Sequence, residues 1–237
     1  MSQVKKAVIL AAGRGTRMKE ITDELPKPMV KVKGMPILES IIRGLVFNGI
    51  TDFLIVVGWR KEVITDYFGD GSDFGCRVEY VEQVVQDGTG RVVELARDFS
   101  GEDPFILSYG DILVPAESYA PLVNFTNVEG KLTVKIDEDV RKGGAVFIVD
   151  GMVTDLIEKG GDDAPKSPYY NAGIYSFSPK IYDYTAKLEL SPRGEYELTD
   201  AIKAQVQDGL PIAAVELDGE WADVRDSKVL DELNRQG

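Results

Sequence analysis

Four short apolar runs, separated by stretches with helical periodicity, restrict the fold of this 237-residue sequence more than any other feature. The first run is short and continuous and ends at a glycine, which is typical of a buried strand. The four runs span residues 7–12, 53–57, 78–81 and 105–108. Apolar residues recur at helical spacing in the intervening segments 36–47, 61–68 and 92–99. This alternation predicts an α/β fold with a doubly wound, mixed but mostly parallel sheet, whose ligands bind at the carboxyl ends of the strands.

The second half of the sequence is less regular and richer in strand patterns. Further strands are predicted at 132–135, 145–149, 153–157, 173–177 and 212–217. The dipeptide Asp150-Gly151 predicts a hairpin between two of them. Helices are predicted at 179–186, 197–208 and 226–234. Because no linker, internal repeat or low-complexity tract interrupts the sequence, we expect one domain over 1–237, with halves of about 1–130 and about 131–237.

The composition favours a cytoplasmic protein that binds neither nucleic acid nor a membrane. The net charge of −13 argues against a nucleic-acid partner, which usually requires a basic surface. No apolar stretch approaches the ~20 residues that cross a bilayer, and the N-terminal sequence runs into the first strand without room for a signal peptide. A single cysteine, Cys76, excludes an internal disulfide and is typical of a reducing compartment.

The sequence contains no histidine. This absence excludes Ser-His-Asp and Cys-His nucleophilic sites, and it excludes zinc sites built on histidine. Any chemistry must therefore depend on carboxylates, Lys, Arg, Tyr or a hard metal ion. Oxygen ligands favour Mg²⁺ over zinc.

The first predicted strand leads into a glycine-containing loop with three cations nearby. Gly13 and Gly15 remove side chains where the backbone must turn and can approach a ligand closely. The cations are Arg14, Arg17 and Lys27. Backbone amides and fixed cations together suit a polyphosphate.

Two familiar phosphate-binding patterns do not match this loop. The dinucleotide-binding pattern requires glycine at position 18, which is Met18, and no Gly-Lys-Ser or Gly-Lys-Thr of a P-loop follows. The Gly-x-Gly spacing alone is equally compatible with a turn that only connects a strand to a helix. The guanidinium of Arg17 and the segment Leu-Pro-Lys-Pro-Met at 25–29 favour a binding loop instead.

Several further motifs occur in the order found in one enzyme family. They are residues 13–18, 25–28, Gln83 with Gly88 and Thr89, 109–111, Glu158 with Lys159, 171–173, 191–200 and 221–223. Through these motifs nearly the whole chain resembles the sugar-1-phosphate nucleotidylyltransferases. It looks closest to glucose-1-phosphate thymidylyl- and uridylyltransferases and N-acetylglucosamine-1-phosphate uridylyltransferases. The resemblance implies a Rossmann-like nucleotidyltransferase fold with a β-rich elaboration that binds the sugar.

The reaction implied by this resemblance is attack of a sugar-1-phosphate oxygen on the α-phosphate of a nucleoside triphosphate, with release of pyrophosphate. A phosphate monoester has a second pKa near ~6, so the nucleophile is already largely deprotonated at neutral pH. No histidine base is needed. Cations and Mg²⁺ can lower the remaining barrier of charge repulsion and alignment.

The resemblance implies roles for individual residues. The implied catalytic residues are Arg17, Lys27, Asp111 and Asp223, of which the two aspartates would hold Mg²⁺. The implied nucleotide-binding residues are Ala12, Gly13, Arg14, Gly15, Thr16, Gln83, Gly88, Thr89, Tyr109 and Gly110. The implied sugar-phosphate-binding residues are Gly144, Glu158, Lys159 and Asn171. The first half would then bind the nucleotide and the second half the sugar phosphate.

The chain departs from the family pattern at two places. The family often has Tyr-Gly where this chain has Gly143-Gly144, and many members continue with glycine where Val224 follows Asp223. The motifs point to a pyrimidine nucleotide, UTP or dTTP, and leave the sugar open. The alternatives are a cytidylyltransferase for a non-sugar phosphate, such as phosphocholine or inositol phosphate, and a non-catalytic nucleotide sensor. We expect no C-terminal β-helix domain. The sequence leaves open whether the protein forms a homo-oligomer.

Overall fold

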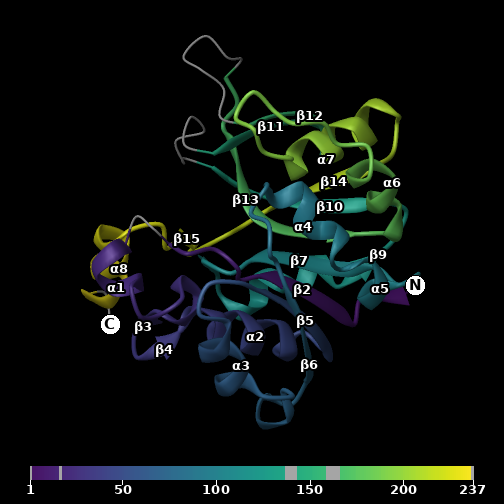
Figure 1. The fold of residues 1–237 in the computed structure, drawn as a ribbon. Coiled ribbons are helices and arrows are strands. Elements are labelled where there is room, and N and C mark those ends of the chain that lie inside the picture. The colour runs from purple at the N-terminus through teal and green to yellow at the C-terminus, as the bar shows by residue number, and fades with distance from the viewer. Residues whose placement is uncertain (1, 16–17, 137–142, 159–165, 236–237) are drawn as a thin grey trace.

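A nine-stranded mixed sheet forms the centre of the computed structural model, which describes residues 2–15, 18–136, 143–158 and 166–235 (Figure 1). Successive side chains of the strands enter two hydrophobic clusters on opposite faces, because side chains alternate along a strand. In strand β2 (Lys6–Leu10), Ala7 and Ile9 belong to one cluster and Val8 to the other. The first cluster is covered by helices α2 and α3, and the second by α4, α6 and α7. The predicted α/β class is confirmed.

The N-terminal half is a four-stranded parallel sheet. Its strands are β2, β5 (Asp52–Val57), β6 (Arg77–Glu82) and β7 (Phe105–Tyr109), in the spatial order β6-β5-β2-β7. The connecting helices are α2 (Ile37–Phe47), α3 (Lys61–Phe68), α4 (Thr89–Glu94) and α5 (Arg97–Ser100). After β2 the chain adds β5 and β6 on one side of β2, and it later adds β7 on the other side. Such a reversal opens a crevice at the carboxyl ends of the two central strands, here β2 and β7.

The C-terminal half is mainly antiparallel. Its strands are β10 (Gly130–Ile136), β11 (Gly144–Val149), β12 (Met152–Glu158), β13 (Tyr169–Phe177) and β14 (Ile212–Glu216). Strand β13 pairs antiparallel with β7 and so joins the halves, while β10 and β14 are parallel. Parallel pairing is thus concentrated in the first half. The predicted hairpin between β11 and β12 is present, with Asp150 and Gly151 both at positive φ, as a tight hairpin turn requires.

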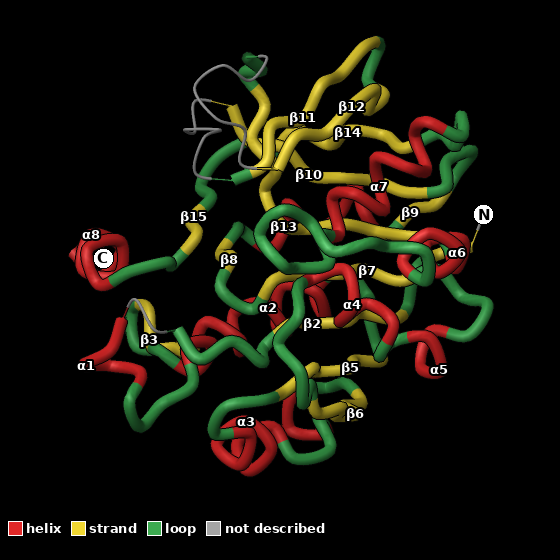
Figure 2. The backbone as a smooth tube through the Cα atoms, turned by 45° about the horizontal axis from the view of Figure 1, so that its top comes forward, coloured by secondary structure: helices red, strands yellow, loops and turns green. Residues whose placement is uncertain are grey.

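Smaller elements surround the sheet (Figure 2). Three two-stranded ribbons are formed by β1 (Ser2–Gln3) with β9 (Asn124–Phe125), β3 (Lys31–Val32) with β4 (Met35–Pro36), and β8 (Ile112–Leu113) with β15 (Ala222–Asp223). Further helices in the described part of the chain are α1 (Lys19–Thr22), η2 (Lys27–Met29), η3 (Ser72–Phe74), η4 (Ala116–Leu122), η6 (Pro179–Ile181), α6 (Tyr182–Thr185), α7 (Leu198–Gln207) and α8 (Ser227–Arg235). Strand β15 leads from the site described below into α8.

The structure corrects one predicted helix. The segment 92–99 is not a single helix but two short ones, α4 and α5, separated at Leu95 and Ala96. Helix α4 also begins earlier, at Thr89, because the backbone amide of Gly90 donates to the carbonyl of Tyr196 at 2.8 Å. Local periodicity cannot predict this contact, because Tyr196 lies in a distant segment of the chain, before α7.

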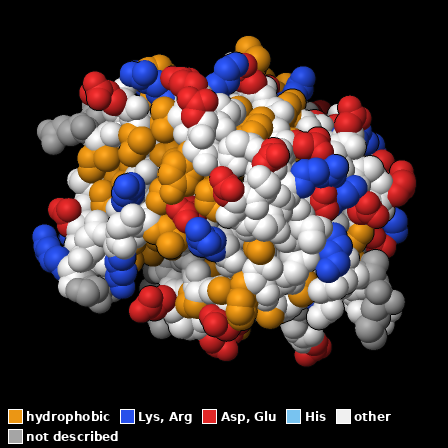
Figure 3. Space-filling model, turned by 90° about the horizontal axis from the view of Figure 1, so that it is seen from below, with side chains coloured by type: hydrophobic (Ala, Val, Ile, Leu, Met, Phe, Trp, Pro, Cys, Tyr) orange, Lys and Arg blue, Asp and Glu red, His pale blue; other side chains and the backbone are white. Residues whose placement is uncertain are grey.

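Surface charge of both signs is interspersed on the face shown in Figure 3, where basic side chains lie scattered among acidic ones. In the part of the chain that the structure describes, no helix is both long and apolar enough to cross a bilayer.

Candidate active site

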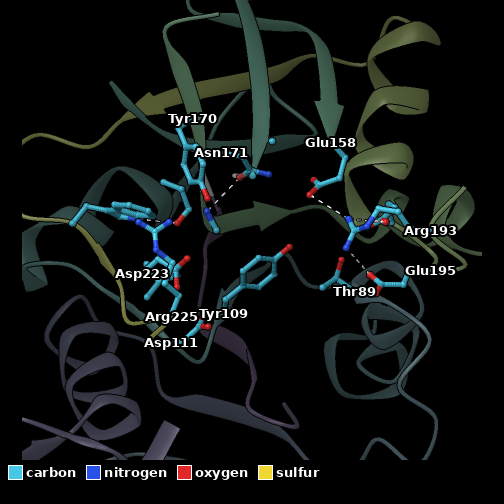
Figure 4. Close-up of a pocket in the computed structure, with 17 residues that line it drawn as sticks. Thr89, Tyr109, Asp111, Glu158, Tyr170, Asn171, Arg193, Glu195, Asp223 and Arg225 are labelled. Atoms are coloured by element: carbon cyan, nitrogen blue, oxygen red, sulfur yellow. Dashed lines mark hydrogen bonds and ion pairs between the residues drawn. The ribbon is translucent and has the colours of Figure 1, made fainter. Parts of the chain in front are cut away.

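Two pockets meet at the carboxyl ends of β2 and β7. The loop pocket, of about 360 Å³, lies between the segment after β2, helix η2 and the segment between β6 and α4. The β13 pocket, of about 540 Å³, lies between β13, β15 and the segment before α7 (Figure 4). Four residues line both pockets: Thr89, Tyr109, Asp111 and Glu195. The two pockets therefore form one continuous cleft at the position expected for a doubly wound sheet.

Close backbone packing forms the floor of the loop pocket. The Gly110 amide donates to the Leu10 carbonyl at 3.0 Å, and a Cβ atom on Gly110 would lie only 2.7 Å from that oxygen. Gly15 has φ +67°, and a Cβ atom there would lie 2.8 Å from Cβ of Lys27. Glycine is therefore required at both positions. By contrast, nothing lies within 4 Å of a Cβ atom placed on Gly13, so its backbone is open to the pocket that it lines.

An ion pair between Lys27 and Asp111 stands where the two pockets join. Lys27 is the first residue of η2, directly after Pro26, and Asp111 lies in the turn at 110–111 that follows β7. The Lys27 side chain is 13% exposed and that of Asp111 28%, so the pair is partly shielded from water. A partly shielded cation and carboxylate interact more strongly than an exposed pair. Both predicted catalytic groups thus come together in the folded protein.

Strand pairing brings the two predicted metal-binding aspartates to the same place. In the β8–β15 ribbon, Asp223 lies opposite Ile112, the neighbour of Asp111. The backbone amide of Val224 donates to the Asp111 carbonyl at 3.0 Å, so the residue that departs from the family pattern contributes to the pairing. Both aspartates line the β13 pocket (Figure 4). Among the described residues no group of three or more His, Cys, Asp or Glu could hold a metal ion. A hard ion bound here would take its other oxygens from substrate and water.

Of the predicted nucleotide-binding residues, Gln83, Gly88 and Thr89 line the loop pocket. The side-chain amide of Gln83 donates to the Val85 carbonyl at 3.0 Å. Gly88 has φ +115°. Sequence reasoning missed Gln86, whose amide donates to the Ala12 carbonyl at 3.2 Å and fastens this segment to the loop after β2. Its only sequence signal is its position between two motif residues.

Arg14 contacts an aromatic side chain of the protein. Its guanidinium lies over the Trp59 ring, 4.3 Å from the centroid, and the Trp59 indole donates to the Thr22 carbonyl at 3.3 Å. Of the residues described, those lining the two pockets do not include Arg14 or Gly15. Their contact with a nucleotide stays a prediction. Thr16, Arg17 and Lys159 lie outside the described residues.

Gly144, Glu158 and Asn171 all line the β13 pocket, as predicted for one site. Gly144 faces Glu158 across the β11–β12 pair. Asn171 accepts hydrogen bonds through Oδ1 from the Tyr175 hydroxyl at 2.9 Å and from the Gly173 amide at 3.3 Å. These bonds fix the amide, so its Nδ2 group is the part oriented to donate to a ligand.

Arg193 is a cation of the β13 pocket that the sequence analysis left without a role. It forms ion pairs with Glu197 at 3.2 Å, Glu195 at 3.3 Å and Glu158 at 3.8 Å (Figure 4). Arg193 lies in the motif 191–200, where it is the single arginine among glutamates. That pattern was the sequence signal that could have identified it as a site residue. Because three carboxylates surround it, Arg193 is held over the pocket and could exchange one partner for an anionic ligand.

The comparisons with known proteins agree with this geometry. The family model described as nucleotidyl transferase matches residues 6–236. The chain belongs to the nucleotidyl transferase family. The resemblance drawn from the sequence motifs is thereby confirmed, and so is the enzyme class at the level of the family.

Three curated relatives of this chain carry different names. The chain is 36% identical to the bifunctional protein GlmU of Methanocaldococcus jannaschii over 92% of its own length and 50% of that protein. It is 33% identical to the low-salt glycan biosynthesis nucleotidyltransferase Agl11 of Haloferax volcanii, over 97% of this chain and 65% of that protein. It is 34% identical to a glucose-1-phosphate thymidylyltransferase of Streptomyces griseus, over 97% of this chain and 65% of that protein. The chain therefore spans only about half to two-thirds of the length of these curated relatives.

Solved structures give the same fold. A putative glucose-1-phosphate thymidylyltransferase from Bacillus anthracis, in complex with a sucrose, superposes with a TM-score of 0.84 at 26% identity. The superposition covers 98% of this chain and 94% of that one. A UDP-glucose pyrophosphorylase complexed with UDP-glucose also superposes with a TM-score of 0.84, at 22% identity, which supports the fold alone.

Replacing Gly88 with alanine should reduce kcat/KM for the nucleotide by about ten- to a hundredfold, because small displacements in a site have large kinetic effects. A Cβ atom there would lie 2.6 Å from the Tyr196 amide nitrogen and closer still to its carbonyl oxygen, and φ is +115°. Gly69→Ala is the matched control, since Gly69 also has positive φ, +53°, but open space around it. Steady-state kinetics of both variants test this; an equal effect in both would assign the loss to backbone strain alone.

Alkaline pH should destabilise the protein through its buried phenols. Burial raises the pKa of Tyr109, Tyr80 and Tyr182 to about 12 each, and it raises the pKa of Tyr175 as well. In the unfolded chain the same phenols ionise near 10. Stability from these groups is therefore complete below pH 10 and falls as pH rises from 10 toward 12. Thermal unfolding midpoints measured from pH 8 to 11.5 should stay level to pH 10 and then decline; a decline that begins near pH 8 would contradict this assignment.

Proposed function

We propose that this protein catalyses Mg²⁺-dependent transfer of a nucleotidyl group from UTP or dTTP to a sugar 1-phosphate, releasing pyrophosphate. The observation that carries the proposal is the Lys27–Asp111 ion pair at the junction of two pockets, with Asp223 held beside it by the β8–β15 ribbon. The loop pocket would bind the triphosphate and base, and the β13 pocket the sugar phosphate. The relatives named for this chemistry support the assignment.

In the proposed reaction a phosphate oxygen of the sugar 1-phosphate forms a bond to the α-phosphorus. The bond between the α-phosphorus and the bridging oxygen breaks, and pyrophosphate leaves with the electron pair. Lys27 would stabilise the charge that grows on the α-phosphate, and Arg17 would hold the departing phosphates. The second pKa of the sugar phosphate is near ~6, so no side chain has to remove a proton.

The charge of the β13 pocket supports a role for a divalent cation. Its described lining contains two guanidinium groups and five carboxylates: Arg193 and Arg225 against Asp111, Glu158, Glu195, Glu197 and Asp223. An excess of carboxylates repels a dianionic sugar phosphate. Asp111 and Asp223 offer the hard oxygens that Mg²⁺ prefers. When bound there, Mg²⁺ would neutralise phosphate charge and help to align the substrates.

The side chains of the two pockets support particular substrate groups. Gln83 can pair with the donor and acceptor edge of a pyrimidine base. Arg193 could accept the sugar phosphate in place of a carboxylate partner, and Glu158 and Asn171 could bind sugar hydroxyls. The cytoplasmic location inferred from composition stays a prediction.

Pyrophosphate release is the direct test. The protein would be incubated with Mg²⁺, one of UTP, dTTP or CTP, and a panel of sugar 1-phosphates, phosphocholine and inositol phosphate. We expect release and a nucleoside-diphosphate-sugar of matching mass with UTP or dTTP and at least one sugar phosphate. Release only with CTP and a non-sugar acceptor would establish the cytidylyltransferase alternative. Nucleotide binding without release for every pair would establish the non-catalytic alternative.

A further inference from the structure

The side chain of Tyr170 occupies the space into which a side chain at position 143 would project. A Cβ atom built on Gly143 would lie 2.5 Å from Cζ and 2.6 Å from Cε2 of the Tyr170 ring, and closer still to its hydroxyl. The position of the tyrosine ring therefore explains why glycine stands at 143.

The Tyr170 ring is held from its other side by Trp221. The two rings meet edge to face, with centroids 5.5 Å apart and an interplanar angle of 64°, a favourable aromatic geometry. The Trp221 indole is in turn fixed by a hydrogen bond from Nε1 to the Ala172 carbonyl at 3.0 Å. Both rings line the β13 pocket, and Tyr170 is 7% exposed. A ring confined in this way forms a rigid wall, since protein interiors yield little to displacement.

The wall lies among the residues that we assign to the sugar. Tyr170 precedes Asn171 on β13 and pairs with Ala145 of β11, next to Gly144. In Figure 4 the ring stands above the pocket on the side of Asp223, opposite Glu158. A bulky sugar substituent directed toward this side would therefore meet an aromatic ring that cannot withdraw.

We propose that Tyr170 is a specificity-determining residue that limits the β13 pocket to sugar 1-phosphates without a bulky substituent on that side, and that Gly143 is its steric counterpart. This inference rests on the proposed function, because it assumes that the β13 pocket holds the sugar.

The test compares a hexose 1-phosphate with its acetamido-substituted analogues in three proteins: wild type, Tyr170→Phe and Tyr170→Ala. Tyr170→Phe is the matched control because it keeps the ring. We expect Tyr170→Ala to raise the kcat/KM ratio of bulky to compact substrate by about tenfold or more, the size of effect that one or two methylene groups produce in a pocket. Most of the change should appear in KM for the sugar phosphate. Tyr170→Phe should leave the ratio within about twofold of wild type.

A second measurement tests the steric pairing without using activity. Gly143→Ala should lower the thermal unfolding midpoint by about 2–12 °C, as overpacking does in a domain of this size. In a Tyr170→Ala background the same substitution should have little or no effect. Additive shifts would show that the two positions do not compete for space.

The outcomes separate this inference from the proposed function. An active wild type whose substrate ratio is unchanged by Tyr170→Ala would overturn the inference and leave the proposed function intact. A wild type that releases no pyrophosphate with any pair would overturn the proposed function, and the sugar role of Tyr170 with it. A shifted ratio together with non-additive unfolding midpoints is the result that supports the inference.

Discussion

Asp111→Ala should reduce kcat by about a hundred- to a thousandfold or more, which is the loss typical when one group that stabilises transition-state charge is removed. Asp111 is the one carboxylate that both pairs with Lys27 and lines both pockets in the described structure. Its loss would remove half of the proposed metal pair and leave Lys27 without its carboxylate partner. Pyrophosphate release at saturating substrates measures this effect.

The same substitution should leave the fold close to wild type. The Asp111 side chain is 28% exposed, so its ion pair contributes modestly to the free energy of unfolding. Asp155→Ala is the matched control, because Asp155 pairs with Lys203 at 2.7 Å outside both pockets. We expect full activity in the control. A large fall in the unfolding midpoint of Asp111→Ala, with activity recovered at low temperature, would instead assign Asp111 a structural role.

Lys27→Met should lower kcat by about a hundredfold or more while changing KM for the nucleotide by only a few-fold. In the free protein the Lys27 ammonium is paired with Asp111, so it gains little from a ground-state phosphate. Its contribution should grow only as charge develops on the α-phosphate, and such an interaction appears in kcat. Methionine keeps the aliphatic stem that packs against Gly15.

A control and a double variant sharpen this prediction. Lys6→Met removes a lysine that pairs with Asp103 at 2.7 Å away from both pockets, and its kinetics should match wild type. Lys27→Met combined with Asp111→Ala should be no slower than the slower single variant, because groups that act as a unit are not additive. An unchanged kcat with a raised KM in Lys27→Met would mean that the lysine only binds substrate.

The sequence predicted the parts of the fold whose pattern is local and repeated. Each of the four apolar runs forms a parallel strand of the N-terminal half, and the segment 61–68 is helix α3 from end to end. The β8 and β15 strands were missed because a two-residue strand has no periodicity to detect. They form only because two segments that are distant in the sequence, 112–113 and 222–223, meet in space. The division of 92–99 into two helices has a similar origin in the contact with Tyr196.

The sequence motifs named residues that lie together in the candidate site, but they did not predict which side chains contact one another. The motif order brought together Lys27, Asp111 and Asp223, and the structure places them at one junction. The contact of Arg14 with Trp59 and that of Arg193 with Glu158 could not be predicted, because each partner comes from a distant segment. Charge and spacing identify which residue types a site uses. They do not identify which partner each one contacts.

The β8–β15 ribbon has a consequence for the order in which the protein becomes competent during synthesis. The loop after β2, helix η2 and strand β7 all lie in the first half of the chain and are synthesised before β15. Asp223 arrives much later, and it joins Asp111 only when β15 pairs with β8. A nascent chain would thus carry most of the loop-pocket lining before it carries the second aspartate, although Glu195 of that lining also comes later. The proposed metal pair would be completed only in a late step, when β15 docks on β8.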